Sequence, residues 1–214
     1  MAGFTMDAQA FLRDLQANND RSWFKANEAR FDAAVREPAF GFIEEAAAWL
    51  EAEGLPWRGE AKKVGGSLSR IHRDVRFSKD KSPYHDYVFV HFWHKDGPTL
   101  PVLGLRISAD DVGLGGGIYS SDTPTLNRIR DAIVADPDGW RAVRDGLDLW
   151  GESLKTAPKG YDKEHPLIED LRRKQFMATW PLTAKQATHD LMPLFQDATH
   201  QMRPWLDFMA DALR

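Results

Sequence analysis

The sequence predicts an α+β fold in which a mainly antiparallel sheet of about four to five strands packs against N-terminal and C-terminal helices. Two observations lead to this prediction. Apolar residues recur at spacings of three and four near both ends of the chain, which is the period of an amphipathic helix. Between these regions, short aromatic and β-branched runs are separated by turn residues, which is typical of strands.

The first sixty residues are predicted to form three helices. Thr5 or Asp7 can cap the first helix, because their side chains can accept hydrogen bonds from the free N–H groups of a first turn. Asp20 can cap the second helix, whose apolar residues continue at helical spacing to Val35. Pro38 can open the third helix, since proline fits the first turn.

Three consecutive runs have the composition of strands: "YVFVHFW" at 87–93, "TLPVLGLRI" at 99–107 and "VGLGGGIYS" at 112–120. Turn residues separate these runs, which favours an antiparallel meander. Because 87–93 is apolar at both alternating sets of positions, we expect both faces of that strand to be covered. A further run, "QFMATWPL" at 175–182, predicts one more strand.

Helices are expected again after the meander. Asp122 or Thr123 can cap one helix, and Pro137 can start another that runs to Trp150. After the fourth strand, Thr183 can cap a helix-rich tail. These helices and the N-terminal ones would cover the sheet.

Length and composition fit one domain over residues 1–214, because no repeat or linker-like segment divides the chain. The chain has no cysteine, which excludes disulfides, thiolate metal sites and cysteine nucleophiles. No stretch approaches the ~18 apolar residues of a membrane-spanning helix, and the first residues lack the pattern of a secretion signal. We therefore expect a cytoplasmic protein with no membrane partner.

Positive charge is concentrated in one part of a mildly acidic chain. The net charge is −4, but residues 62–81 hold seven Lys or Arg and two Asp, a net of +5. Much of this charge lies in "RIHRDVRFSKDKSPYHD" at 70–86. Because a local excess of charge usually faces a local anion, this stretch is the first candidate for a functional site.

Other signatures of chemistry are absent or weak. No glycine-rich loop precedes Gly-Lys-Ser or Gly-Lys-Thr, and the glycines at 115–117 lack the spacing of a dinucleotide-binding motif. Four residues within ten positions carry metal-ligating atoms: His85, Asp86, His91 and His94. However, His91 and His94 would point to opposite faces of one strand. We expect no metal site and no cofactor.

Two conformations of the basic stretch are compatible with its pattern. If residues 67–77 are extended, Arg70 and Arg76 lie on one face. The other face would then be an apolar back made of Ile71, Val75 and Phe77. The apolar residues are also three and four apart from Leu68 onward, which is compatible with a helix that would scatter the arginines.

The stretch at 70–86 is close to a signature of Arg-Ile-Tyr-Arg-Asp followed by Arg-Phe-Ser-Lys-Asp-Lys and Pro-Tyr. Supporting segments are "NNDRSWFKANEARFD" at 18–32, "GLGGGIYSSDTPTLNRIRDAI" at 113–133 and "LKTAPKGYDKEHPLIEDLRRKQF" at 154–176. On these residues the chain resembles the bacterial and fungal conserved hypothetical proteins grouped as domain of unknown function family 2461. The resemblance implies a single full-length domain and supplies no catalytic residues. His72 and His85 depart from the family pattern, which argues against a mechanism built on either histidine.

The leading functional hypothesis is binding of a small phosphate- or carboxylate-bearing ligand, because guanidinium groups bind such anions in a bidentate manner. We expect six cationic side chains to bind it: Arg70, Arg73, Arg76, Lys79, Lys81 and Arg106. If the protein is an enzyme, the base would be Asp74 or Asp80 and the polarising hydroxyl would be Tyr84 or Tyr119.

Two alternatives use the same residues differently. The basic surface would bind nucleic acid or an acidic protein, with Phe77 or Trp93 available for stacking. The acidic remainder of the chain disfavours long nucleic acid. In the other alternative, Asp74 and Asp80 neutralise the cations within an ion-pair network. The sequence leaves these alternatives, enzymatic activity and oligomeric state open.

Overall fold

The computed structural model of the protein describes residues 4–119, 122–187 and 190–214. Helices and one six-stranded antiparallel sheet make up the fold, which confirms the predicted α+β class, with one strand more than the upper expectation. The strands are β1 (Trp57–Arg58), β2 (Tyr87–His94), β3 (Val102–Ser108), β4 (Val112–Ile118), β5 (Asp148–Trp150) and β6 (Phe176–Pro181).

The strand order is β1-β2-β3-β4-β6-β5, and every neighbouring pair is antiparallel. The predicted meander is therefore confirmed as β2, β3 and β4, and the predicted fourth strand is β6. The two edge strands were not predicted. They are two and three residues long, which is too short for an alternating apolar pattern to be recognised.

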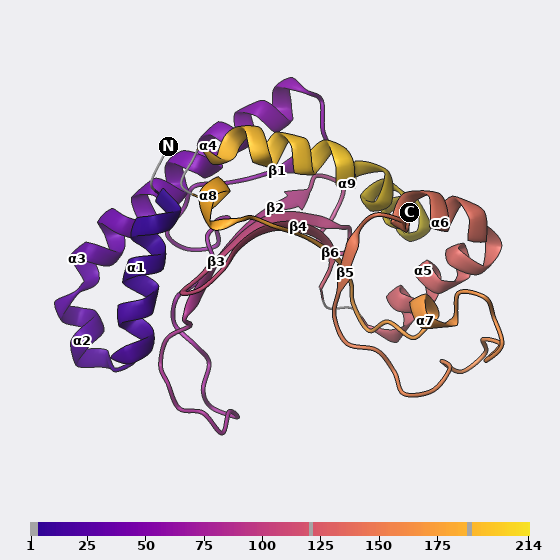
Figure 1. Ribbon diagram of the computed structural model, residues 1–214, viewed down its shortest axis with the longest axis horizontal. Helices are drawn as coiled ribbons and strands as arrows, with labels where there is room; N and C mark the ends of the chain where they lie inside the picture. The colour runs from indigo at the N-terminus through magenta and orange to yellow at the C-terminus, as the bar shows by residue number, and fades with distance from the viewer. Residues whose placement is uncertain (1–3, 120–121, 188–189) are drawn as a thin grey trace.

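The helical segments divide into an N-terminal and a C-terminal group. They are α1 (Phe4–Ala17), α2 (Arg21–Ala26), α3 (Glu28–Phe31), the π-helix η1 (Asp32–Arg36), α4 (Glu37–Ala52), α5 (Thr123–Ala135), α6 (Pro137–Arg144), α7 (Ile168–Leu171), α8 (Ala184–Ala187) and α9 (Leu191–Leu213). In Figure 1 the N-terminal helices lie at one end of the sheet, α5, α6 and α7 lie at the other, and α9 spans the space between them.

Asp20 and Asp122 cap α2 and α5 as predicted, whereas the predicted caps Thr5 and Asp7 lie inside α1. The Asp20 carboxylate accepts hydrogen bonds from the N–H groups of Ser22 and Trp23, both at 2.9 Å, and so caps α2 as predicted. The predicted second helix is nevertheless divided at Asn27 into α2, α3 and η1. The helix expected to run to Trp150 ends at Arg144, and the chain then enters β5.

One face of the sheet is covered by helices. Helix α1 packs on β3, α4 on β1 and β2, and α9 on β4. Side chains on this face are fully or almost fully buried, including Val90, Phe92, Leu105 and Leu114. Burial of this apolar surface supplies the main favourable contribution to folding.

The other face of the sheet is less covered than expected. Phe89, His91 and Trp93 alternate with the buried residues of β2 and are only half-buried, so the prediction that both faces of this strand are covered is wrong. The rings pack along the strand instead: His91 lies 5.9 Å from Phe89 and 4.6 Å from Trp93 between centroids. Phe89 also lies against the bare backbone of Gly104, where a Cβ atom would overlap its ring.

Among the described helices, none is both long enough and apolar enough to cross a bilayer.

Candidate functional site

Residues 68–86, which we call the basic loop, form neither a continuous strand nor a helix. Isolated bridges join Leu68 to Val90 and His72 to Tyr84. The N–H of Arg73 donates to the carbonyl of Pro83 at 2.9 Å, so the two halves of the loop run antiparallel and place residues 74–82 at its tip. In Figure 1 the tip projects away from the helices. The helical alternative for this stretch is therefore wrong, and the extended alternative holds only at the base of the loop, where Leu68 and His72 form bridges.

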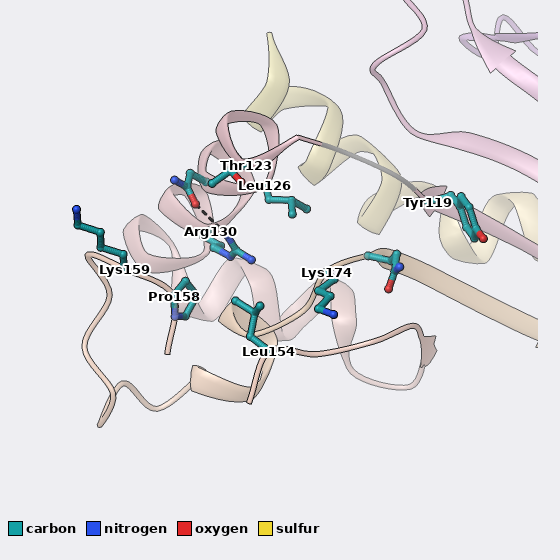
Figure 2. Close-up of a pocket in the computed structure, with 10 residues that line it drawn as sticks. Tyr119, Thr123, Leu126, Arg130, Leu154, Pro158, Lys159 and Lys174 are labelled. Atoms are coloured by element: carbon teal, nitrogen blue, oxygen red, sulfur yellow. Dashed lines mark hydrogen bonds between the residues drawn. The ribbon is translucent and has the colours of Figure 1, made fainter. Parts of the chain in front are cut away.

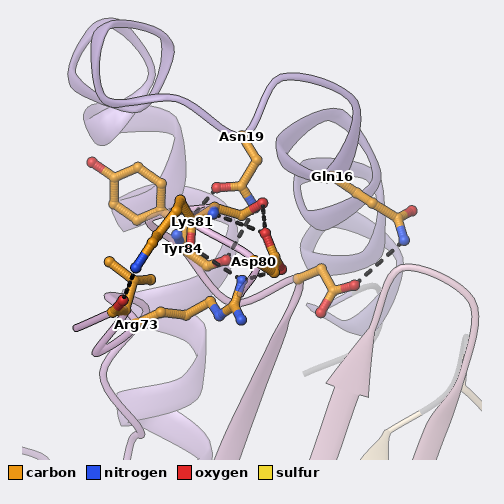
Figure 3. Close-up of polar contacts among 9 residues, drawn as sticks. Gln16, Asn19, Arg73, Asp80, Lys81 and Tyr84 are labelled. Atoms are coloured by element: carbon orange, nitrogen blue, oxygen red, sulfur yellow. Dashed lines mark hydrogen bonds and ion pairs between the residues drawn. The ribbon is translucent and has the colours of Figure 1, made fainter. Parts of the chain in front are cut away.

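The base of the basic loop is anchored to the N-terminal helices. Tyr84 is 5% exposed, and its ring stacks on Phe24 with centroids 4.2 Å apart. Its backbone N–H donates to the Asn19 side chain, which in turn donates to the Tyr84 carbonyl, as Figure 3 shows. Burial raises the pKa of the Tyr84 phenol. The predicted apolar back is confirmed at Ile71, which is buried, and is wrong at Phe77, which is 95% exposed.

Two arginines of the basic loop pair with aspartates of the same loop. Arg73 Nη1 lies 2.5 Å from an Asp80 oxygen. Arg76 binds Asp74 in a bidentate manner, with Nε at 2.9 Å and Nη2 at 2.6 Å from the carboxylate. Both pairs are solvent-exposed on at least one side, where ion pairs contribute little to stability.

Hydrogen bonds to the two carboxylates lower their pKa values. For Asp80 the backbone N–H of Ser82 has the largest effect, followed by the Ser82 hydroxyl and Arg73. For Asp74 the Arg76 side chain has the largest effect. Both carboxylates are therefore held in the charged form, which makes either a poor general base near neutral pH.

The remaining predicted cations do not form one cluster. Lys81 Nζ donates to the carbonyl of Val75 at 3.0 Å. Arg106 lies on β3, where it binds Asp111 through contacts of 2.8 and 2.7 Å and lies over the Tyr87 ring. Arg70 and Lys79 are exposed and make no hydrogen bond or ion pair within the ranges that the structure describes.

A pocket with a volume of about 620 Å³ lies elsewhere, between α5 and the chain on either side of α7 (Figure 2). We call it the α5 pocket. Its lining combines polar, cationic and apolar side chains: Tyr119, Thr123, Leu126, Asn127, Arg130, Leu154, Pro158, Lys159, Lys174 and Gln175. Of the candidate catalytic residues, Tyr119 lines this pocket, whereas Asp74, Asp80 and Tyr84 belong to the basic loop.

Helical periodicity explains how α5 contributes to the pocket. Thr123, Leu126, Asn127 and Arg130 are three or four positions apart and so share one face of the helix. The Asp122 carboxylate caps α5 by accepting a hydrogen bond from the N–H of Thr125 at 2.8 Å. The opposite wall comes from the connection between β5 and α7 and from Lys174 and Gln175, which lie between α7 and β6.

Arg130 differs from the other residues of the α5 pocket, because its charge is buried and no carboxylate of the described residues pairs with it. It is 3% exposed. Nε donates to the carbonyl of Leu171 at 2.7 Å, Nη2 to that of Arg173 at 2.9 Å, and Nη1 to the side-chain oxygen of Asn127 at 2.8 Å. Across the described chain, no carboxylate oxygen lies within the 4.0 Å of an ion pair with Arg130. Burial lowers the pKa of this guanidinium.

A buried carboxylate is present on nearby α7, but other groups use it. Asp170 accepts a hydrogen bond from Trp140 Nε1 at 2.9 Å. It also lies 3.3 Å from Arg173 Nε and 3.4 Å from Arg144 Nε. Buried charges are normally paired. Asp170 follows this rule, because two guanidinium groups lie near it, whereas the acceptors bonded to Arg130 are all neutral.

The other charged residues that line the α5 pocket are also cations. Lys159 is exposed, and Lys174 contacts Glu152 at 2.9 Å. No Asp or Glu is among the described residues that line the pocket. The Tyr161 hydroxyl, which lies 3.1 Å from the Asn127 carbonyl, donates to Asp131, and burial together with this bond raises its pKa to about 12. Tyr161 is therefore neutral near pH 7 and does not offset the positive charge.

Sequence reasoning did not identify the α5 pocket, although a signal for it was present. All the residues that line the pocket fall within 113–133 and 154–176, two of the segments that support the family resemblance.

The histidines are placed as expected: His91 lies on the half-buried face of β2, while His94 is buried on the other. Over the described ranges, no group of three or more potential metal-ligating residues comes together.

The fold and the pocket define an α+β protein whose antiparallel sheet carries helices on one face and a cation-lined pocket at one end. The chain matches the family described as "Conserved hypothetical protein (DUF2461)" over residues 7–208 and belongs to that family. Searches of curated proteins and of solved structures found no match.

Proposed function

We propose that the protein binds a small phosphate- or carboxylate-bearing molecule in the α5 pocket. The observation that carries this proposal is the burial of Arg130 beside a cavity, with neutral hydrogen-bond acceptors and no carboxylate partner among the residues that the structure describes. A buried charge without a counter-charge is costly, and an anionic ligand would supply that counter-charge. The class of ligand is the one expected from the sequence, but the binding site differs.

Lys159 and Asn127 support the same ligand class. Lys159 lies in an exposed part of the pocket lining and makes no hydrogen bond or ion pair inside the described ranges, so its ammonium group is available. The side-chain oxygen of Asn127 accepts from Arg130, which leaves its amide N–H groups as further donors. Charge-assisted hydrogen bonds from such donors are the stronger ones in proteins.

A titration of methyl phosphate followed by ³¹P NMR would test the proposal. Replacing Arg130 would also disturb folding, so the test variant is Lys159→Gln. It should weaken binding about tenfold, which corresponds to the loss of one charge-assisted hydrogen bond. Lys163→Gln is the matched control, because Lys163 is exposed on the same connection but does not line the pocket. This control should bind as the wild type does.

The same titration separates the α5 pocket from the basic loop. The double variant R70Q/K79Q removes the two loop cations that make no hydrogen bond or ion pair within the described ranges. If this variant loses binding while Lys159→Gln does not, the anion binds at the loop and the proposed pocket is wrong. If the wild type binds neither methyl phosphate nor acetate, the proposed function itself is wrong.

A second candidate function rests on Phe77. Its ring is 95% exposed, and its only described ring contact is with the Arg76 guanidinium, 5.8 Å from the centroid. An exposed ring among cations could stack on a base of single-stranded nucleic acid. Gel-shift titrations at several salt concentrations test this function, which requires binding that weakens steeply as salt increases and is lost in Phe77→Ala.

A further inference from the structure

A pair of stacked aromatic rings lies at one end of the α5 pocket. Tyr119 follows β4 and Trp150 ends β5, and their centroids are 5.9 Å apart with the ring planes at 13°. The two strands are not neighbours, since β6 lies between them. The stack therefore depends on the tertiary fold and not on proximity along the chain.

Both rings are unusually exposed. Tyr119 is 60% exposed and Trp150 is 50% exposed, whereas Trp57, Trp140 and Trp205 are almost fully buried. Large aromatic side chains contribute most when they are buried. A rigid aromatic surface beside a cavity is a common element of sites that bind small molecules.

The two ends of the α5 pocket differ in chemistry. Figure 2 shows Tyr119 at the opposite end from Lys159 and Pro158, with Arg130 between them. The Tyr119 end offers an aromatic ring, and the α5 end offers cations and the Asn127 amide. A molecule that filled the pocket would meet a flat apolar surface at one end and positive charge at the other.

We infer that the ligand is a flat aromatic ring joined to a phosphate or carboxylate group. The ring would lie against Tyr119, which Trp150 holds in place by stacking, and the anionic group would lie near Arg130 and Lys159. This inference rests on the proposed function, because it requires an anion in the α5 pocket. Aryl phosphates and nucleoside monophosphates share this chemistry.

The test compares phenyl phosphate, methyl phosphate and phenol in ³¹P and ¹H NMR titrations of the intact chain. Phenyl phosphate should bind about tenfold more tightly than methyl phosphate, because stacking on one aromatic side chain contributes an affinity of this order. Phenol, which lacks the anion, should bind more weakly than phenyl phosphate. Adenosine monophosphate distinguishes the source of the ring: tighter binding than phenyl phosphate indicates a nucleobase, and weaker binding indicates a simple aryl group.

Tyr119→Ala should remove the advantage of phenyl phosphate over methyl phosphate, and Tyr119→Phe should keep it. Met6→Ala is the control, since it removes a large exposed apolar side chain that does not line the pocket. If methyl phosphate binds as tightly as phenyl phosphate in the wild type, the aromatic part of the inference is wrong while the proposed anion binding stands. If neither phosphate binds, the proposed function fails and the inference fails with it.

Discussion

The basic loop and the α5 pocket hold cations in opposite settings. In the loop, Arg73 and Arg76 are exposed to different degrees and each contacts an aspartate of the same loop. In the pocket, Arg130 is buried and donates to two carbonyls and one amide oxygen. The comparison shows that a high density of positive charge along a sequence does not identify uncompensated charge in the fold, because nearby acidic residues can neutralise it.

The largest expected difference concerns stability at Arg130. Arg130→Ala should lower the free energy of unfolding by about 4 kcal/mol, since the buried carbonyl of Leu171 and the part-buried carbonyl of Arg173 each lose a donor, at roughly 1–3 kcal/mol per unsatisfied group. Urea denaturation measures this change. Arg128→Ala, an exposed position on the same helix, should change it by less than about 0.5 kcal/mol. Similar effects for the two variants would contradict the role assigned to the buried guanidinium.

The anchor of the basic loop should come next. Tyr84→Ala should cost about 3 kcal/mol, because a buried ring stacked on Phe24 is removed. Tyr84→Phe should cost less than about 1 kcal/mol, since no hydrogen bond of the hydroxyl is among the described contacts of this residue. Urea denaturation of both variants separates packing from a polar role. A large loss in Tyr84→Phe would show that the hydroxyl has a partner and would restore it as a candidate for chemistry.

A much smaller effect is expected at the tip of the loop. Arg76→Ala should change the free energy of unfolding by less than about 0.5 kcal/mol, because exposed ion pairs are worth little. The same denaturation experiment, repeated at high salt, should show no further change. A loss comparable to that of Arg130→Ala would mean that the tip is structurally essential and would remove the distinction between the two regions.

Acid should break the ion pair at the tip of the basic loop but leave the hydrogen bonds of Arg130 intact. Loss of the exposed ion pair should change the free energy of unfolding very little. Because hydrogen bonding lowers the pKa of Asp74 below its ordinary value of 3.8, the Arg76–Asp74 pair contributes fully above pH 3.8 and is lost as the pH falls below that value. The Nε–H resonance of Arg76 should therefore shift in this acidic range. That of Arg130, bonded to the Leu171 carbonyl, should not follow the same titration, and a parallel shift would contradict its pairing with neutral groups.

Local signals explain which parts of the fold could be predicted. The cap at Asp20 and the aromatic and β-branched composition of β2 act over a few residues, and both the capped helix and the strand are confirmed. The break at Asn27 was missed, because apolar residues before and after it keep helical spacing and are buried on the same side. Strands β1 and β5 depend on pairing with β2 and β6 and carry little pattern of their own.

The candidate site was harder to predict than the fold, because its partners are distant in sequence. Arg130 donates to carbonyls that lie 41 and 43 residues further along the chain. On α5 its spacing places it on the same face as Leu126, but spacing alone cannot show whether a carboxylate will meet it. In the basic loop the opposite holds: Asp74 is two residues from Arg76, and the ion-pair alternative was already visible in the sequence.

Because α9 is the last helix of the chain and packs on β4, the sheet cannot be fully covered until synthesis is almost complete. After the ribosome has made β4, it must add roughly seventy more residues before α9 begins. This synthesis takes on the order of ten seconds. Until the last part of that interval β4 lacks its neighbour β6, and throughout it lacks the helix that packs on it. A strand inside the finished sheet is thus among the last to be enclosed, and its apolar face is the part of the nascent chain that a chaperone would meet.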